Sequence, residues 1–216
     1  YIFSGGPGNP LVGDESWLKP FHDLIEDLWR YNRQCDSPKK YCFFICHSFQ
    51  MACHHFQLGK IARRREKSFG TFPVFKTPEG EQEWLFRELD NPFWVADFRE
   101  YQVIDPNWTR LQEIGASLLL IEQERDRPEM KRAMMAVRFS GEMIGTQFHP
   151  EADPIGMRSY FSEPDRVKAV LEEFGEARYF SMVDDLNDPS KIARTHKIIL
   201  PLFLFTAISQ LKIQYN

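Results

Sequence analysis

The segment Phe43–His55, FFICHSFQMACHH, is the part of the chain richest in residues that can carry chemistry. It contains Cys46, Cys53 and three of the chain's six histidines, and Cys42 directly precedes it. A thiol becomes a nucleophile as its thiolate, which the positive N-terminal end of a helix stabilises. The apolar run before Cys46 and the helical pattern after it predict that Cys46 lies in a sharp strand-to-helix turn. We therefore expect Cys46 to be the reactive thiol.

The other cysteines of this region are expected to be structural. Cys42 falls inside the predicted strand and Cys53 lies well past the first helical turn, so both are predicted to be small buried hydrophobic residues. A zinc site is the alternative, and its ligands would come from Cys46, His47, Cys53, His54 and His55. The spacing fits no paired zinc knuckle, and adjacent helical residues point about 100° apart. The sequence therefore predicts no metal site.

A cysteine nucleophile needs a base, and the base needs an orienting group. The segment Gly145–Glu151, GTQFHPE, offers both. Residues two apart at the end of a strand point to the same side, so Glu151 can bind one nitrogen of His149 while the other nitrogen faces a thiol. Near the N-terminus, the glycines of Ser4–Gly8, SGGPG, let the backbone approach a substrate closely and direct an N–H at a developing oxyanion.

In chain order these segments are SGGPG, the strand-to-helix turn at Cys46 and GTQFHPE. Together and in this order they resemble the class I (triad-type) glutamine amidotransferases, with Gln-Phe-His-Pro-Glu as the most specific element. The resemblance covers residues 1–151 and extends plausibly to Gly175, and its motif style is closest to GMP synthase-type domains. It implies a flavodoxin-like α/β fold with a mostly parallel central sheet flanked by helices. Open sheets of this kind bind ligands at the carboxyl ends of their strands.

The resemblance also implies an activity. The family hydrolyses the side-chain amide of glutamine through a cysteinyl thioester, and releases glutamate and ammonia for a synthetase. By this resemblance Cys46 is the nucleophile, His149 is the general base and then acid, and Glu151 orients His149. No cofactor is implied, and the ammonia acceptor is expected to be a separate synthetase.

Four further residues have roles implied by the resemblance alone. The backbone N–H groups of Gly6 and His47 form the oxyanion hole. Gly5 and Gln50 contribute to the binding of glutamine or another γ-glutamyl compound.

Two segments depart from the family pattern. The family usually has Gly-x-Cys-x-Gly, whereas this chain has Phe44 and Ser48 at the glycine positions. The segment Phe98–Val103 also lacks the family's His-Ser-Asp or His-Gly-Asp sequence. These departures leave two alternatives, which are a stand-alone γ-glutamyl peptide hydrolase and a catalytically inactive binding module.

Apolar runs of strand length alternate with helical patterns, which indicates an α/β protein. Residues 1–175 are predicted to form the amidotransferase-like domain, whose first N-terminal strands would precede Tyr1, and residues 176–216 a C-terminal helical extension. The expected strands are 41–46, 117–121, 132–139 and 143–148, the last two as a hairpin. The expected helices are 17–31, 47–56 with Gly59 as C-cap, 81–89, 164–174 opened by Ser162, and 191–211 with a break or kink at Pro201.

Composition narrows the class of partner. The 216 residues carry a formal net charge of −4, with a pI near 5.9, and a nucleic-acid surface would need a basic face. The apolar run Ile198–Ile208 is about half of the ~20 residues that span a membrane. We therefore expect neither nucleic acid nor membrane as a partner, and a homodimer is one way to cover the apolar C-terminal segment. Cysteines confined to one segment favour a reduced, cytoplasmic setting.

Overall fold

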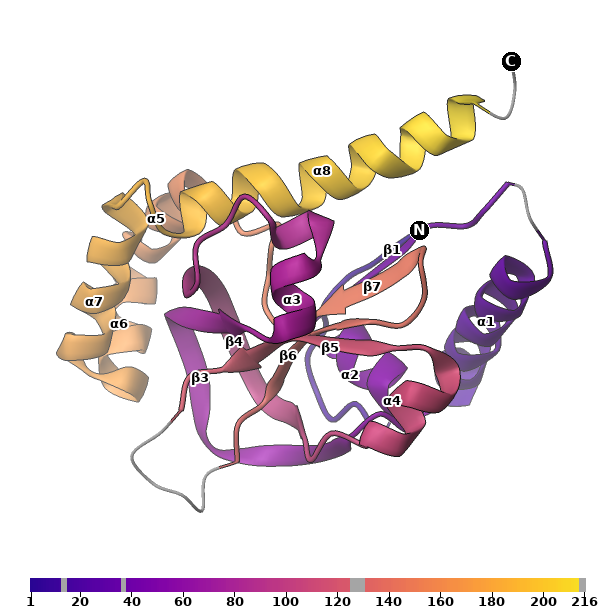
Figure 1. Cartoon of the computed structure of the whole chain (residues 1–216). Coiled ribbons are helices and arrows are strands. Elements are labelled where there is room, and N and C mark those ends of the chain that lie inside the picture. The colour runs from indigo at the N-terminus through magenta and orange to yellow at the C-terminus, as the bar shows by residue number, and fades with distance from the viewer. Residues whose placement is uncertain (13–14, 36–37, 125–130, 214–216) are drawn as a thin grey trace.

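Seven strands form one curled sheet in the part of the chain that the structure describes, residues 1–12, 15–35, 38–124 and 131–213. The structure is a computed structural model, and it confirms the predicted α/β class, with helices packed around the sheet (Figure 1). In chain order the elements are β1 (Ile2–Phe3), α1 (Glu15–Gln34), β2 (Cys42–Ile45), α2 (His47–His55), β3 (Lys60–Lys76), α3 (Pro78–Gln82), the 3-10 helix η1 (Trp84–Phe86), β4 (Phe93–Ile104), α4 (Trp108–Ile114), β5 (Ser117–Glu122), β6 (Met134–Arg138), β7 (Met143–Thr146), α5 (Pro154–Phe161), α6 (Pro164–Phe174), α7 (Glu176–Asn187) and α8 (Ile192–Ile213).

The strand order is β1-β2-β7-β6-β5-β3-β4, and the sheet is mixed. β2 is parallel to β1 and to β7, whereas the other four pairings are antiparallel. The prediction of a mostly parallel sheet is therefore wrong. The physical reason is that β6 and β7 are joined by the predicted short hairpin, and that β3 and β4 form a long antiparallel pair. Parallel neighbours instead need a long crossover connection.

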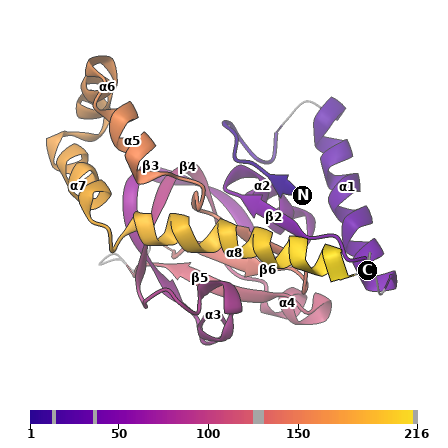
Figure 2. The same ribbon diagram turned by 90° about the horizontal axis from the view of Figure 1, so that it is seen from above.

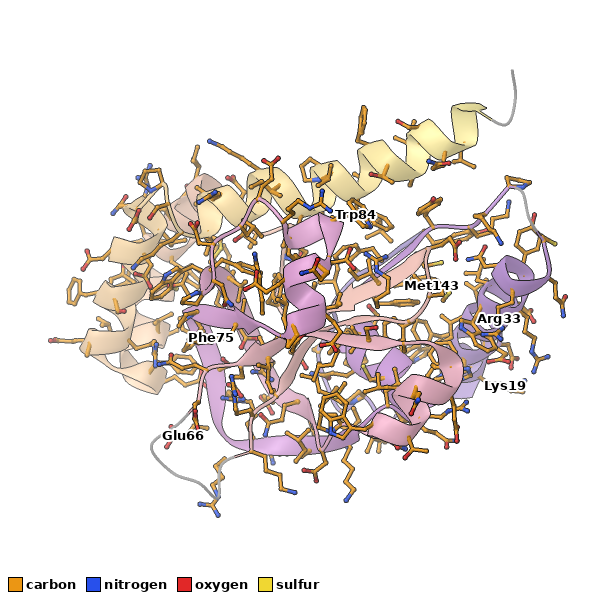
Figure 3. All side chains as sticks on the ribbon, in the orientation of Figure 1. Lys19, Arg33, Glu66, Phe75, Trp84 and Met143 are labelled. Atoms are coloured by element: carbon orange, nitrogen blue, oxygen red, sulfur yellow. The ribbon has the colours of Figure 1, made fainter. Side chains whose placement is uncertain are left out.

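The two faces of the sheet carry separate apolar cores. Successive strand residues point to opposite faces, so Phe44 of β2 packs with α1, α2 and α4, whereas Phe43 packs with η1 and α8. Figure 2 shows α8 lying along the sheet, and Figure 3 shows Trp84 of η1 beside this helix. A third apolar cluster joins α5 and α7 to β3 and β4 at one end of the molecule. β2 is thus buried on both sides.

The helix predicted over residues 81–89 is instead α3 followed by η1. Thr77 caps α3 by accepting the N–H of Gly80 at 3.0 Å, and Pro78 opens the helix. The helix ends at Glu83, whose extended backbone (φ −71°, ψ 119°) separates it from η1. Thr77 and Pro78 therefore start the helix earlier than its apolar pattern predicts. The extended backbone of Glu83 also ends it earlier.

The helix after Cys46 ends at His55, and Gly59 is not its C-cap. The left-handed position that follows belongs to Gln57, with φ 60°. Gly59 is instead a close-packing position, because a Cβ there would lie 2.8 Å from Cγ1 of Val103. The glycine thus allows the start of β3 to pair tightly with β4.

The C-terminal part of the chain is more helical than its sequence pattern indicates. The helix 164–174 is confirmed as α6, although its N-cap is Glu163, while Ser162 ends α5. The acidic segment after Gly175 forms α7, and α8 runs without interruption through Pro201. By length and composition alone, Ile192–Leu211 of α8 could cross a membrane, yet Ile199 and Phe203 of this segment lie in the core. The division at residue 175 and the absence of a membrane partner stay predictions.

Candidate active site

The carboxyl ends of β1, β2 and β7 meet at one place on the sheet edge, because these three strands are parallel neighbours. Gly5 follows β1, Cys46 follows β2 and His149 follows β7. A Cβ on Gly5 would lie 3.1 Å from Cε1 of His149 and 3.5 Å from Cβ of Cys46. The topology therefore brings together three segments that are far apart in the sequence, and glycine is the residue that leaves room for the other two.

Cys46 occupies the predicted elbow between β2 and α2, with φ 51° and ψ −101°. Such a conformation is strained for a residue with a Cβ, and it persists only where the surroundings enforce it. The Cys46 N–H donates to the carbonyl of Thr146 at 2.8 Å. The hydroxyl of Ser48 accepts the N–H of Ile45 at 2.9 Å and donates to the carbonyl of Phe3 at 2.7 Å. Ser48 therefore braces the turn at a position where the family usually has glycine.

Phe44 is accommodated by a glycine on the neighbouring strand. Its ring is fully buried, stacks on Phe3 at 4.8 Å and meets Phe139 edge to face. Phe44 pairs in register with Gly145 of β7, where an added Cβ would lie 3.0 Å from the Cβ of Phe44 and 2.9 Å from Cδ2 of Phe49. The space that a glycine before the nucleophile would provide is thus supplied from β7.

His149 and Glu151 form the predicted pair, with Nδ1 of His149 2.7 Å from Oε1 of Glu151. The backbone N–H of His149 donates to the carbonyl of Ala96 at 2.9 Å, which ties this segment to β4. Burial lowers the pKa of His149, but hydrogen bonds to Cys46 and Glu151 and the negative charges of both outweigh it and raise the pKa to about 10. The imidazole is therefore held as an imidazolium at neutral pH.

Gln147 also contacts the thiol, and the motif analysis did not single it out. It is fully buried, and its Nε2 donates to Sγ of Cys46 at 3.8 Å. Gln50 donates both to Oε1 of Gln147, at 3.1 Å, and to the carbonyl of Tyr101, at 2.8 Å. Gln50 lines the cavity, and its amide N–H groups hold Gln147 and β4 in place, while its role in substrate binding stays a prediction. Its position inside the Gln-Phe-His-Pro-Glu motif could have identified Gln147 as a residue of the site.

The two residues predicted to form an oxyanion hole lie side by side. As the first residue of α2, His47 has no intrahelical acceptor for its backbone N–H. A Cβ on Gly6 would lie 3.8 Å from Nδ1 of His47, so the glycine loop approaches the start of the helix closely. Burial lowers the pKa of His47, which favours the neutral ring beside the thiol. Their role as donors stays a prediction.

A buried arginine lies close to the thiol, and the sequence analysis missed it. Nε of Arg99 donates to both carboxylate oxygens of Asp97, at 3.0 and 2.9 Å, and Nη2 donates to Glu122 at 3.2 Å. Nη1 is buried without a hydrogen-bond partner among the described residues. Burial lowers the pKa of Arg99, but the charges of Asp97, Glu122 and Cys46 raise it overall. Asp97 and Arg99 carry opposite charges and lie two residues apart, on one face of β4. This pattern in the sequence could have indicated the buried pair.

The remaining cysteines and histidines of the opening segment have structural surroundings. Burial raises the pKa of Cys42 to about 12 and that of Cys53 well above its usual value, so both are neutral buried thiols, as predicted. His55 binds Glu26 at 3.0 Å and stacks on His22 at 5.2 Å. Across the described ranges, no three ligating side chains are grouped so that they could hold a metal ion.

Cys46 lines a cavity of about 470 Å³ that separates it from helices α5 and α6. One part of its lining comes from the glycine loop and the start of α2, including Gly6 and His47. The other part comes from β3, β4 and the two helices, and it is rich in aromatic side chains. A volume of this size is typical of small-molecule sites.

Comparison with known proteins places the fold. No protein-family model and no curated protein sequence matches the chain. A glutamine amidotransferase from Thermotoga maritima has a TM-score of 0.65 at 17% identity, over 97% of this chain and 77% of that one. A glutamine amido transferase from Methylobacillus flagellatus has a TM-score of 0.64 at 15% identity, over 97% and 74%.

A third solved structure, the glutaminase domain of Trypanosoma brucei CTPS with bound acivicin, has a TM-score of 0.51 at 13% identity, over 69% of this chain and 62% of that one. This protein therefore has the fold of glutamine amidotransferases, which is the fold that the resemblance of its motifs implies. The identities are low, so the likeness concerns the fold.

Proposed function

We propose that this protein is a cysteine-dependent amidase of the glutamine amidotransferase type, which hydrolyses the side-chain amide of glutamine or of a γ-glutamyl compound. The observation that carries the proposal is the arrangement of Cys46, His149 and Glu151 at the carboxyl ends of β2 and β7. A strained elbow exposes the thiol to the cavity, and the imidazole lies between the thiol and a carboxylate.

The proposed reaction has two halves. The thiolate of Cys46 attacks the amide carbonyl carbon and forms a C–S bond, and the oxyanion is bound by the N–H groups of Gly6 and His47. The C–N bond then breaks, and the nitrogen takes the proton held by His149. Water attacks the resulting thioester while His149 accepts a proton from it, and the C–S bond breaks to release glutamate.

Glu151 keeps His149 in position and charged during the first half of this cycle. Gln147 is a positioning residue in the proposal, because its amide fixes the direction of the thiol, and Gln50 holds Gln147 in turn. An inactive binding module, which is the competing function, would have no use for a strained cysteine beside an imidazolium.

We further propose that ammonia, where glutamine is the substrate, passes to a separate synthetase in the cytoplasm. GMP synthase-type chemistry is the acceptor reaction that the motif style favours. A stand-alone γ-glutamyl hydrolase is the second candidate, and the size and aromatic lining of the cavity favour it.

Covalent capture tests the proposal. A glutamine-mimicking diazoketone is expected to add one equivalent to the wild-type protein, at Cys46, and none to Cys46→Ser. Cys42 and Cys53 provide internal controls, because burial keeps their thiols neutral. Peptide mass mapping locates the adduct. Absence of an adduct at Cys46, with and without candidate synthetases, would contradict the amidase function.

A further inference from the structure

Four aromatic side chains form one continuous wall of the cavity that contains Cys46. The ring of Phe69 on β3 stacks on Phe174 at 4.3 Å and meets Phe161 at 5.4 Å and Phe98 at 5.2 Å. All four rings are half-buried, so they pack against one another and still face the cavity. Such a surface favours an apolar or aromatic ligand group.

The wall begins at the catalytic base. The ring of Phe98 lies 6.1 Å from the ring of His149, and its carbonyl oxygen lies 3.9 Å from Sγ of Cys46. In the proposed reaction His149 gives its proton to the departing nitrogen, so this nitrogen must lie next to His149. A substituent on that nitrogen would therefore extend from His149 along Phe98 towards Phe69.

The charged residues around this wall largely neutralise one another. Nζ of Lys67 binds Glu100 at 3.1 Å and Glu173 at 2.7 Å. Arg166 lies over the ring of Tyr160 at 4.7 Å, at the same side of the cavity. Ammonia is small and polar, and it gains nothing from an aromatic surface of this extent. The lining thus fits a larger, apolar leaving group.

We infer that the preferred substrate is a γ-glutamyl amide whose nitrogen carries an aromatic or bulky apolar group. This inference rests on the proposed amidase function and concerns its leaving group. Hydrolysis forms the Cys46 thioester, breaks the C–N bond and transfers a proton from His149 to the substituted nitrogen, which leaves as the amine. Water then cleaves the thioester to glutamate, so one water is consumed for each amide and no redox partner is needed.

The test compares three substrates with the wild-type chain, namely glutamine, γ-glutamyl methylamide and γ-glutamyl benzylamide. Release of glutamate and of each amine is followed by mass spectrometry. Contact of the benzyl ring with the aromatic wall is expected to raise kcat/KM at least about tenfold over the methylamide. This comparison uses only the wild-type protein, so it does not depend on how any variant folds.

Variants then locate the effect. Phe161→Ala is expected to reduce the ratio of kcat/KM for the benzylamide over the methylamide to less than about threefold, and Phe161→Leu is expected to keep part of this preference because leucine fills more of the space. Phe180→Ala is the matched control, because this ring is 57% exposed on α7 and does not line the cavity.

The outcomes separate the two levels of the proposal. If kcat/KM for glutamine and for the methylamide equals that for the benzylamide, the inference about the leaving group is wrong and the amidase function stands. If none of the three is hydrolysed and the diazoketone does not label Cys46, both are wrong. A benzylamide preference that Phe161→Ala leaves intact would also overturn the assignment of the wall.

Discussion

Glu151 controls the charge of His149, because a carboxylate oxygen lies 2.7 Å from Nδ1 of the imidazole. Together with Cys46 it raises the pKa of His149 to about 10, against the effect of burial. In the proposed reaction the leaving nitrogen takes its proton from His149, so activity is expected to persist up to the pH at which His149 loses that proton. The alkaline limb of kcat/KM should therefore lie near pH 10 rather than near the usual histidine range.

Glu151→Gln is expected to move this alkaline limb down by about 1–2 pH units, because removal of the negative charge lowers the pKa of His149. The measurement is the pH profile of kcat/KM for the best substrate. Glu176→Gln, an exposed carboxylate on α7, is the matched control and should leave the profile unchanged. A profile that does not move in Glu151→Gln would show that another group carries the proton.

Gln147→Leu is expected to slow alkylation of Cys46 by iodoacetamide about tenfold, because the thiolate loses a hydrogen bond of the charge-assisted kind. Leucine conserves most of the buried volume, so the thermal transition should shift far less than the alkylation rate. Gln112→Leu, on the exposed side of α4, serves as the control. Equal alkylation rates in the two variants would rule out a positioning role for Gln147.

At the scale of elements, the site depends on how closely β2 and β7 approach behind the nucleophile. Phe44 takes the position that the family usually gives to glycine, and Gly145 on β7 lies opposite it in register. The close contact between them fixes the distance between the segment of Cys46 and that of His149.

Gly145→Ala is expected to lower the free energy of unfolding by about 1–3 kcal/mol, because the new methyl group clashes with Phe44 and Phe49. Urea denaturation measures this change. Gly141→Ala is the control, because a Cβ there meets nothing within 4 Å, and it should change stability by less than about 0.5 kcal/mol. The destabilisation should be smaller when Gly145→Ala is combined with Phe49→Ala, which removes the ring atom Cδ2 that lies 2.9 Å from the added Cβ, and an additive double mutant would refute this contact.

At the scale of the whole molecule, α8 belongs to the core as well as to the C-terminal region. Phe203 is 2% exposed and meets the ring of Phe43 at 5.1 Å, next to the strand that carries the nucleophile. Phe205, two residues further on, is 70% exposed. One side of the helix thus stabilises the sheet while the other faces outward. The predicted homodimer through this outer face stays a prediction.

Phe203→Ala is expected to reduce the free energy of unfolding by about 3–5 kcal/mol, because it leaves a cavity between α8 and β2. Phe205→Ala should change it by less than about 0.5 kcal/mol. Calorimetry measures the unfolding transitions of both variants and shows whether α8 stabilises the sheet. If the two transitions matched that of the wild type, α8 would be a separable extension, as the division at residue 175 predicts.

The sequence alone determined the order of the candidate catalytic segments and predicted their chemistry. Cys46, His149 and Glu151 follow from local rules, because a strand-to-helix turn exposes its residue and residues two apart at a strand end share a side. The hairpin of β6 and β7, the helix after Cys46 and the buried thiols of Cys42 and Cys53 were predictable for the same reason.

Only the tertiary structure decided the rest, because those features depend on contacts between segments distant in the sequence. Gln147 contacts the thiol, and Arg99 lies close enough for its charge to interact with it, only through the packing of β7 and β4. The aromatic wall combines β3, β4, α5 and α6. The mixed sheet also depends on long-range pairing, which no local periodicity reveals. Local patterns thus predict the candidate reactive residues, whereas tertiary packing determines which side chains surround them.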